Sequence, residues 1–240
     1  MVARYAHRGR EEIRARVRKA RDMLSVTLTQ RCFYLFAALL MVIMAVPFLE
    51  GSPHGRILLN AINLSVMIAA IVAFGRGFGA LAIGLLLALP AAASMVVGQT
   101  FEARGWVILS NAFAAAFYFT TISYLLSYAL RRDVLTMDKL YGAAAAFLML
   151  GGLWMYFYFI LLWFYPGALT LNGAPITVLP PSTMLFFSFV TLTSTGMSDV
   201  MPVHPIARTL CVLEMVTGLL YITVLIARLA GSYPPHERAR

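Results

Sequence analysis

The chain has 240 residues, of which 61% are hydrophobic and only 12% are charged, and its mean hydropathy is +0.81. A soluble domain has about 45–50% apolar and about 25% charged residues, so the composition excludes a water-soluble globular protein. The formal net charge of +9 would suggest a nucleic-acid partner in a soluble chain. Here most basic residues flank apolar segments, so we expect no nucleic-acid partner and predict an integral membrane protein.

The N-terminal segment 1–31 is rich in arginine and has no long apolar run. Ile13, Val17, Ala20 and Leu24 recur at helical spacing and form one apolar stripe. This pattern predicts a basic amphipathic helix in the cytoplasm, lying on anionic membrane lipid. A helix that docks a partner or senses a signal is the alternative.

From Cys32 onward the sequence becomes a series of apolar runs separated by short polar breaks. Each run has roughly the 20 residues that a helix needs to cross about 30 Å of hydrocarbon. We therefore predict six transmembrane helices, at Cys32–Leu49, Ile57–Phe74, Gly79–Val97, Trp106–Tyr128, Tyr141–Phe164 and Thr209–Leu229.

The basic residues predict the orientation of these spans. With both termini in the cytoplasm, all 19 lysines and arginines except Arg56, Arg104 and Arg208 fall on the cytoplasmic side. We therefore expect the cytoplasmic (inner) membrane, with both termini inside. The fourth span, Trp106–Tyr128, contains no basic residue. Because a voltage sensor needs several basic residues along one helix, we predict that this region is not a voltage sensor.

Polar and sulfur-containing residues inside the spans have simple interpretations. Cys32 and Cys211 lie in apolar runs, and we expect them to be packed thiols rather than a disulfide or a metal pair. Thr120, Thr121 and Ser123 in the fourth span are predicted to form hydrogen bonds to neighbouring helices.

The segment after the fifth span differs from the rest of the chain. Asn172-Gly173 predicts the turn of a small extracellular hairpin, and Pro181-Ser182-Thr183 predicts a helix start with a capping hydroxyl. The apolar stretch Met184–Val190 is too short to cross a bilayer, and it leads into the hydroxyl-rich run Thr191–Asp199. Polar backbone at membrane depth is tolerated only beside a watery cavity, so we predict a re-entrant helix and loop.

The run Phe187–Thr193, the loop after it, Asp199–Pro202 and the last apolar helix resemble the tetrameric pore-loop potassium channel family in order and spacing. The resemblance covers about residues 141–230. It implies an all-α homotetramer in which each subunit has six spans and a re-entrant helix. The filter of that family reads T-V-G-Y-G, and its carbonyl oxygens replace the hydration shell of the ion. The matching positions are Ser194, Thr195, Gly196, Met197 and Ser198, preceded by Thr193.

Two filter positions depart from the family pattern. Met197 replaces the tyrosine that braces the filter, and Ser198 replaces the second glycine. If position 198 needs a left-handed backbone, a residue with a Cβ is penalised by roughly 1–2 kcal/mol. We therefore expect a passive pore for monovalent cations with weakened potassium selectivity. A potassium-selective channel and a non-conducting structural or regulatory protein remain alternatives.

The expected chemistry is limited to permeant K⁺ and Na⁺ in the filter. We expect no other metal, no cofactor and no enzymatic activity, because the sequence has no catalytic triad, metal-ligand spacing or phosphate loop. Asp199, directly after the filter, is predicted to support it or to concentrate cations at its mouth. Gly218 is predicted to be a gating hinge, with close helix packing as the alternative, and Ile222 and Ile226 to line the cavity or gate.

Glu214 lies inside the sixth span, where an ionisable side chain is costly and is a functional residue by default. It is predicted to support the filter, either by titrating or by a hydrogen bond to Thr191 or Ser188. Four parts of the chain follow from these assignments: a cytoplasmic N-terminal helix at 1–31, an outer four-helix region at 32–140, a pore domain at 141–230 and a short cytoplasmic tail at 231–240.

Overall fold

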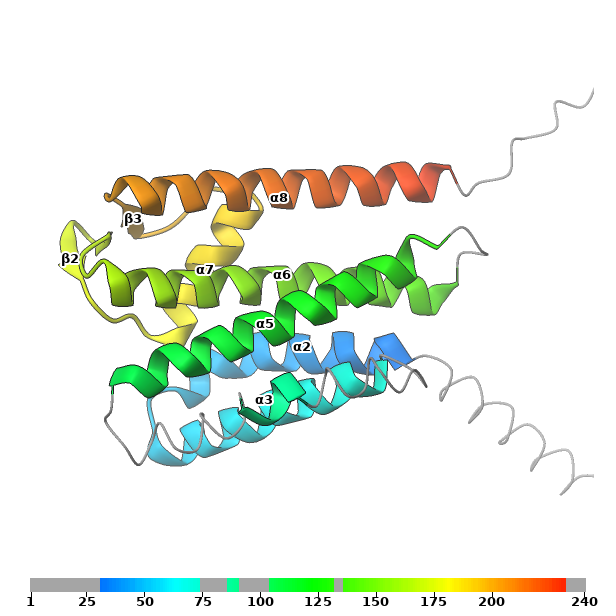
Figure 1. The fold of residues 1–240 in the computed structure, drawn as a ribbon, viewed down its shortest axis with the longest axis horizontal. Coiled ribbons are helices and arrows are strands. Elements are labelled where there is room, and N and C mark those ends of the chain that lie inside the picture. Colours follow the sequence, from blue (N-terminus) through cyan, green and yellow to red (C-terminus); the bar gives the residue numbers. More distant parts are fainter. Residues whose placement is uncertain (1–30, 74–85, 91–103, 132–135, 232–240) are drawn as a thin grey trace, which may run out of the picture.

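The computed structural model describes residues 31–73, 86–90, 104–131 and 136–231. Long helices run side by side along one axis, and a small sheet lies at one end, called here the sheet end (Figure 1). In chain order the elements are α2 (Arg31–Leu49), α3 (Pro53–Ala73), α5 (Arg104–Ala129), α6 (Met137–Phe164), β1 (Leu169–Leu171), β2 (Ala174–Ile176), α7 (Pro181–Leu192), β3 (Val200–Pro202) and α8 (Pro205–Ala230).

Four helices in the described part of the chain are long and apolar enough to cross a membrane. They agree with the first, fourth, fifth and sixth predicted spans. Helix α3 covers the second predicted span, but its apolar part, Ala61–Ile71, is shorter than a full span. The third predicted span, Gly79–Val97, and the basic helix at 1–31 fall mostly outside the described residues.

Helix α6 lies at the centre of the bundle and packs against α2, α5, α7 and α8. Two glycines at its middle permit this. A Cβ on Gly151 would lie 2.7 Å from the ring of Phe189 on α7. A Cβ on Gly152 would lie 2.6 Å from the ring of Tyr118 on α5. Because real Cβ contacts are longer than these, the glycine pair sets how closely α5 and α7 approach the central helix.

The end of the bundle opposite the sheet is joined by Asp138, in the first turn of α6. Its Oδ1 accepts a 2.9 Å hydrogen bond from the backbone N–H of Cys32, and its Oδ2 accepts a 3.0 Å bond from the Tyr128 hydroxyl. A carboxylate near a helix N-terminus is favourable, because it accepts from N–H groups that have no partner inside the helix. One side chain therefore connects the starts of α2 and α6 with the end of α5.

The sheet has the order β2-β1-β3, with all neighbours antiparallel. The predicted hairpin at Asn172-Gly173 is confirmed. These two residues have φ angles of 51° and 84°, and Leu171 pairs with Ala174 on either side of them. Positive φ at both turn residues is typical of the tight turn whose twist matches a hairpin. The third strand, β3, was not predicted.

The predicted interhelical hydrogen bonds of α5 are wrong. Thr120, Thr121 and Ser123 donate to the carbonyl oxygens of Ala116, Phe117 and Phe119 in their own helix, each four residues earlier. Short hydroxyl side chains reach that carbonyl easily, so they satisfy themselves without a neighbouring helix. The two cysteines, Cys32 and Cys211, are free and buried, as predicted.

Candidate functional site

Helix α7 has 12 residues and a length of about 18 Å at 1.5 Å per residue, too short to cross a bilayer. It lies between α6 and α8 in the sheet half of the bundle (Figure 1). Met184, Phe187, Ser188, Val190 and Leu192 are buried in these contacts. The sequence thus places a short apolar helix inside the bundle, packed between two long helices.

The N-terminus of α7 is capped by a residue distant in sequence. Pro180 is the N-cap residue and offers no side-chain acceptor. The predicted capping hydroxyl, on Ser182, instead lies within the helix and donates to Oε1 of Glu50, while the Ser182 backbone N–H donates to Oε2 over 2.9 Å. Glu50 directly follows α2, and a carboxylate at a helix N-terminus is stabilising. Sequence reasoning missed this contact, which spans 132 positions.

The loop after α7, here called the 193–198 segment, has an unusual backbone. Ser194 and Gly196 have positive φ angles of 55° and 75°, and no other residue of the segment does. Ser198 is therefore not left-handed, and the penalty considered for it in the sequence analysis does not arise. Ser194, which carries a Cβ, adopts that conformation instead. The backbone N–H of Ser194 donates a 2.9 Å hydrogen bond to the carbonyl oxygen of Thr191, and this bond helps to hold Ser194 in the left-handed conformation.

The carbonyl oxygens of the 193–198 segment have no recorded hydrogen-bond donor among the described residues. The segment is also open to solvent in the single chain, since residues 193–197 are exposed and Ser198 is half-buried. The hydroxyls of Thr193 and Thr195 lie 2.8 Å apart. Water can hydrate these exposed carbonyls in the single chain, whereas backbone acceptors that become buried nearly always need a partner. Such a row can coordinate a hard, weakly bound cation.

Met197 does not pack behind this segment, because 71% of its side chain is exposed. A cavity of about 170 Å³ lies between the 193–198 segment, α7, α8 and β3. Thr191, Ser194 and Ser198 contribute polar groups to its wall, and Cys211 and Met215 contribute sulfur. The structure therefore leaves open space beside the segment, and Met197 does not fill it.

The sheet holds the far end of the segment. The backbone N–H of Asn172, in the hairpin turn, donates to the carbonyl oxygen of Asp199 over 3.1 Å. Strand β3 follows at once and pairs with β1. The carboxylate of Asp199 is exposed, and no hydrogen bond to it from another described residue is recorded. Its role as a filter support or a cation-concentrating charge stays a prediction.

Glu214 is fully buried and connects three helices. Its Oε1 lies 2.6 Å from the hydroxyl of Ser188 on α7, and its Oε2 accepts a 2.5 Å bond from the hydroxyl of Tyr158 on α6. The Ser188 hydroxyl also lies 2.8 Å from the carbonyl oxygen of Gly151. The predicted partner Ser188 is present, whereas the Thr191 hydroxyl donates within α7, to Phe187. Sequence reasoning missed Tyr158.

Gly218 is in direct contact with the end of α7. A Cβ at this position would lie 2.0 Å from the carbonyl oxygen of Leu192, the last residue of α7. This contact gives the glycine a packing role, the alternative raised in the sequence analysis, and its function as a hinge stays a prediction. Helix α8 continues through it without interruption.

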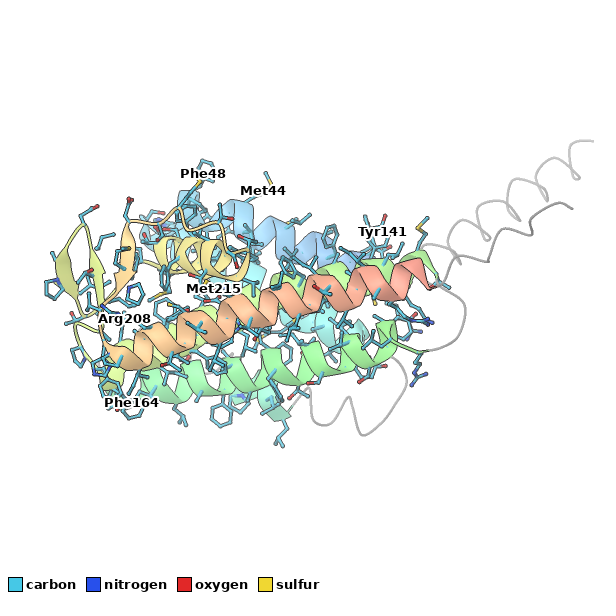
Figure 2. The ribbon with its side chains drawn as sticks, turned by 90° about the horizontal axis from the view of Figure 1, so that it is seen from above. Met44, Phe48, Tyr141, Phe164, Arg208 and Met215 are labelled. Carbon is cyan, nitrogen blue, oxygen red and sulfur yellow. The ribbon has the colours of Figure 1, made fainter. Side chains whose placement is uncertain are left out.

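Helix α8 lies at the edge of the bundle and exposes most of its apolar surface (Figures 1 and 2). Ile222 and Ile226 belong to this surface, with 40% and 60% of their side chains exposed. Such a large apolar face needs lipid or another chain to cover it. Exposed large apolar residues on α8 are Ile206, Val212, Leu213, Val216, Leu219, Leu220, Ile222, Val224 and Ile226.

Residues 146–232 match the model of a protein family described as "Ion channel". The matched part contains most of α6, the 193–198 segment, the whole of α7 and β3, and α8. No curated protein and no solved structure matches the chain. The match supports an ion channel domain at 146–232, and together with the apolar helices it indicates an integral membrane protein.

Proposed function

We propose that four copies of this chain form a channel that conducts monovalent cations passively, with the 193–198 segment as its filter. The observation that carries the proposal is the row of six unpartnered carbonyls at the end of a short buried helix. In a fourfold assembly these oxygens would surround one axis and replace the hydration shell of K⁺ or Na⁺. The match of residues 146–232 to an ion channel family supports the same conclusion.

Association of four copies would also cover the exposed apolar surface of α8. In that assembly Ile222 and Ile226 would line the cavity or gate, Gly218 would join α8 to the end of the filter helix, and Asp199 would contribute to a ring of carboxylates at the mouth. Such a ring raises the local concentration of cations. With the termini in the cytoplasm, the sheet end faces outward and the basic segment 1–31 meets anionic lipid.

We propose that potassium selectivity is weakened. Met197 is exposed and does not line the cavity beside the filter, so it does not replace the bracing tyrosine in the outer half of the filter. A potassium-selective pore is the second candidate. It is favoured by the backbone at Ser198, which is not left-handed and so stores no strain at that residue. A non-conducting protein is the third outcome of the experiment below.

Ion flux from proteoliposomes tests the proposal. The purified full chain, shown to be tetrameric by cross-linking, is expected to release both K⁺ and Na⁺, at rates within about tenfold of each other. Empty liposomes are the control. Release of K⁺ alone would favour the selective candidate, and no release from confirmed tetramers would contradict conduction.

A double substitution in the filter tests the account of selectivity. Met197→Tyr with Ser198→Gly is expected to raise the K⁺-to-Na⁺ ratio several-fold, because the ring can fill the cavity behind the filter. Met44→Tyr is the matched control and should leave the ratio unchanged, since Met44 lies on α2, is 72% exposed and does not line this cavity. An unchanged ratio in the double variant would show that the open space does not limit selectivity.

A further inference from the structure

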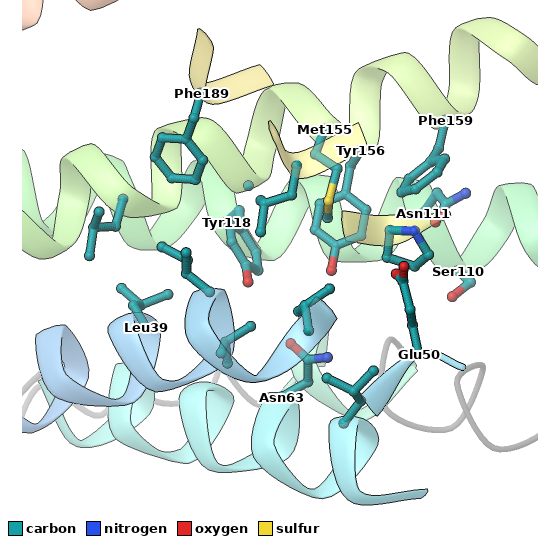
Figure 3. Close-up of a pocket in the computed structure, with 18 residues that line it drawn as sticks. Leu39, Glu50, Asn63, Ser110, Asn111, Tyr118, Met155, Tyr156, Phe159 and Phe189 are labelled. Atoms are coloured by element: carbon teal, nitrogen blue, oxygen red, sulfur yellow. The ribbon is translucent and has the colours of Figure 1, made fainter. Parts of the chain in front are cut away.

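A second and larger cavity, of about 340 Å³, lies between α2, α3, α5, α6 and α7 (Figure 3). It is formed by different residues from those around the 193–198 segment. Its volume lies within the range of about 300–1,000 Å³ that is usual for small-molecule sites. The cavity thus joins the outer helices to the short helix α7.

The lining of this cavity is divided into two parts. Leu39 and Phe189 lie toward one end, and the hydroxyls of Tyr118 and Tyr156 lie between the two ends, as Figure 3 shows. Glu50, Asn111 and Ser110 lie at the other end, and Asn63 faces them from α3. An apolar pocket with a few polar groups at one end is suited to a small amphiphile.

The polar end has hydrogen-bond acceptors and a negative charge. Glu50 is the only charged residue among the side chains that line the cavity in the described part of the chain. Its recorded bonds both go to Ser182, which leaves further lone pairs on the two carboxylate oxygens. The side-chain amides of Asn63 and Asn111 have no recorded hydrogen bond to another described residue.

We propose that this cavity binds a small lipophilic amine, in its protonated form, with the ammonium group at Glu50 and the hydrocarbon chain toward Phe189. An ammonium group has three donors and no acceptor, which matches the carboxylate and the amide oxygens at this end. A carboxylate amphiphile fits poorly, because no lysine or arginine among the described residues lines the cavity to pair with it. Because the ammonium charge is opposite to that of the carboxylate, the amine is expected to bind more tightly than a neutral alcohol of equal length.

Binding at this site regulates the filter, and this step rests on the proposed channel function. Glu50 caps α7, and Pro181, Leu185 and Phe189 of the same helix line the cavity. An ammonium group that bonds to the free lone pairs of Glu50 offsets the carboxylate charge that stabilises the first turn of α7. The amine therefore weakens the cap of the helix that carries the filter and lowers ion flux.

Binding is measured first, with the detergent-solubilised full chain, labelled octylamine and 1-octanol as probes, at pH 7. An alkylamine is protonated there, because its pKa resembles that of lysine at about 10.4. Octylamine is expected to bind about tenfold more tightly than 1-octanol, as a charge-assisted hydrogen bond requires. Equal affinities for the two probes in the wild-type chain would overturn the proposal.

Three variants locate the site. Glu50→Gln is expected to abolish the preference for the amine, and Asn111→Leu, which leaves the α7 cap intact, to reduce it about threefold. Val42→Phe narrows the cavity and is expected to weaken the binding of both octylamine and 1-octanol. Met44→Phe on the same helix is the matched control and should change neither, since Met44 is 72% exposed and projects away from the bundle (Figure 2). Unchanged octylamine binding in the Val42→Phe variant would show that the amine does not bind in this cavity.

Flux from proteoliposomes tests the regulatory step separately. Octylamine is expected to reduce flux at least threefold in the wild type and in Met44→Phe, and to have little effect in Val42→Phe. Inhibition that survives in Val42→Phe would mean block of the pore itself and would overturn regulation from this cavity. Specific binding by a chain that shows no flux would contradict the channel function and leave the binding site supported.

Discussion

Replacing Gly218 with alanine is expected to destabilise the protein by about 3 kcal/mol, near the upper end of overpacking effects. The added Cβ would lie 2.0 Å from the carbonyl oxygen of Leu192, and a backbone atom cannot turn away as a side chain can. The better helix propensity of alanine contributes only about 1 kcal/mol in the opposite direction. Thermal unfolding and ion flux should both show the loss, because Leu192 immediately precedes the 193–198 segment.

Gly105→Ala is the matched control for this substitution. Gly105 lies in the first turn of α5, and a Cβ there would meet no atom within 4 Å. It should leave stability unchanged or slightly raised. A Gly218→Ala variant as stable as the wild type would contradict the close approach of α8 to α7. A stable variant with altered opening would instead favour the hinge predicted from the sequence.

The second large effect is expected at Glu214. Its replacement by alanine should lower the free energy of unfolding by about 2–4 kcal/mol, and its replacement by glutamine by less than about 1 kcal/mol. Alanine leaves the buried hydroxyls of Ser188 and Tyr158 without their partner. Glutamine has nearly the same shape, and its amide can accept from Tyr158 while it donates to Ser188. Urea or thermal unfolding of the two variants in parallel measures the difference.

The comparison also reports whether Glu214 holds a proton. The Ser188 hydroxyl has one hydrogen but lies near two acceptors, on Gly151 and on Glu214. A protonated carboxyl resolves this, because it donates to Ser188, which then donates to Gly151. No lysine or arginine is recorded in contact with Glu214 within the described residues. A glutamine variant as unstable as the alanine variant, or with a different dependence of conductance on pH, would show that the negative charge is needed.

The local parts of the site could be predicted from the sequence because their signals are contiguous. The length of the apolar stretch before Thr191 predicted a helix too short to span, and Asn172-Gly173 predicted the hairpin turn. Both depend on a few neighbouring residues. The Ser188–Glu214 contact could be anticipated because both residues lie in apolar helices that the motif places side by side.

The remaining features depend on contacts that no local pattern encodes. Glu50 and Ser182 are 132 positions apart, and nothing near either residue indicates the other. The left-handed non-glycine residue of the loop is Ser194 rather than Ser198, because backbone bonds to α7, and not residue type, determine the conformation there. Strand β3 has three residues and exists only because β1 lies beside it.

The bond between Glu50 and Ser182 means that the segment 146–232, which matches an ion channel family, is not a self-sufficient module. Its shortest helix takes the acceptor for its first turn from another part of the chain. Any rearrangement that separated the two parts, by gene fusion or by exchange with a related pore, would have to supply a replacement acceptor. A substitution at Glu50 is therefore expected to affect the first turn of α7, although Glu50 and Ser182 belong to different units of the sequence.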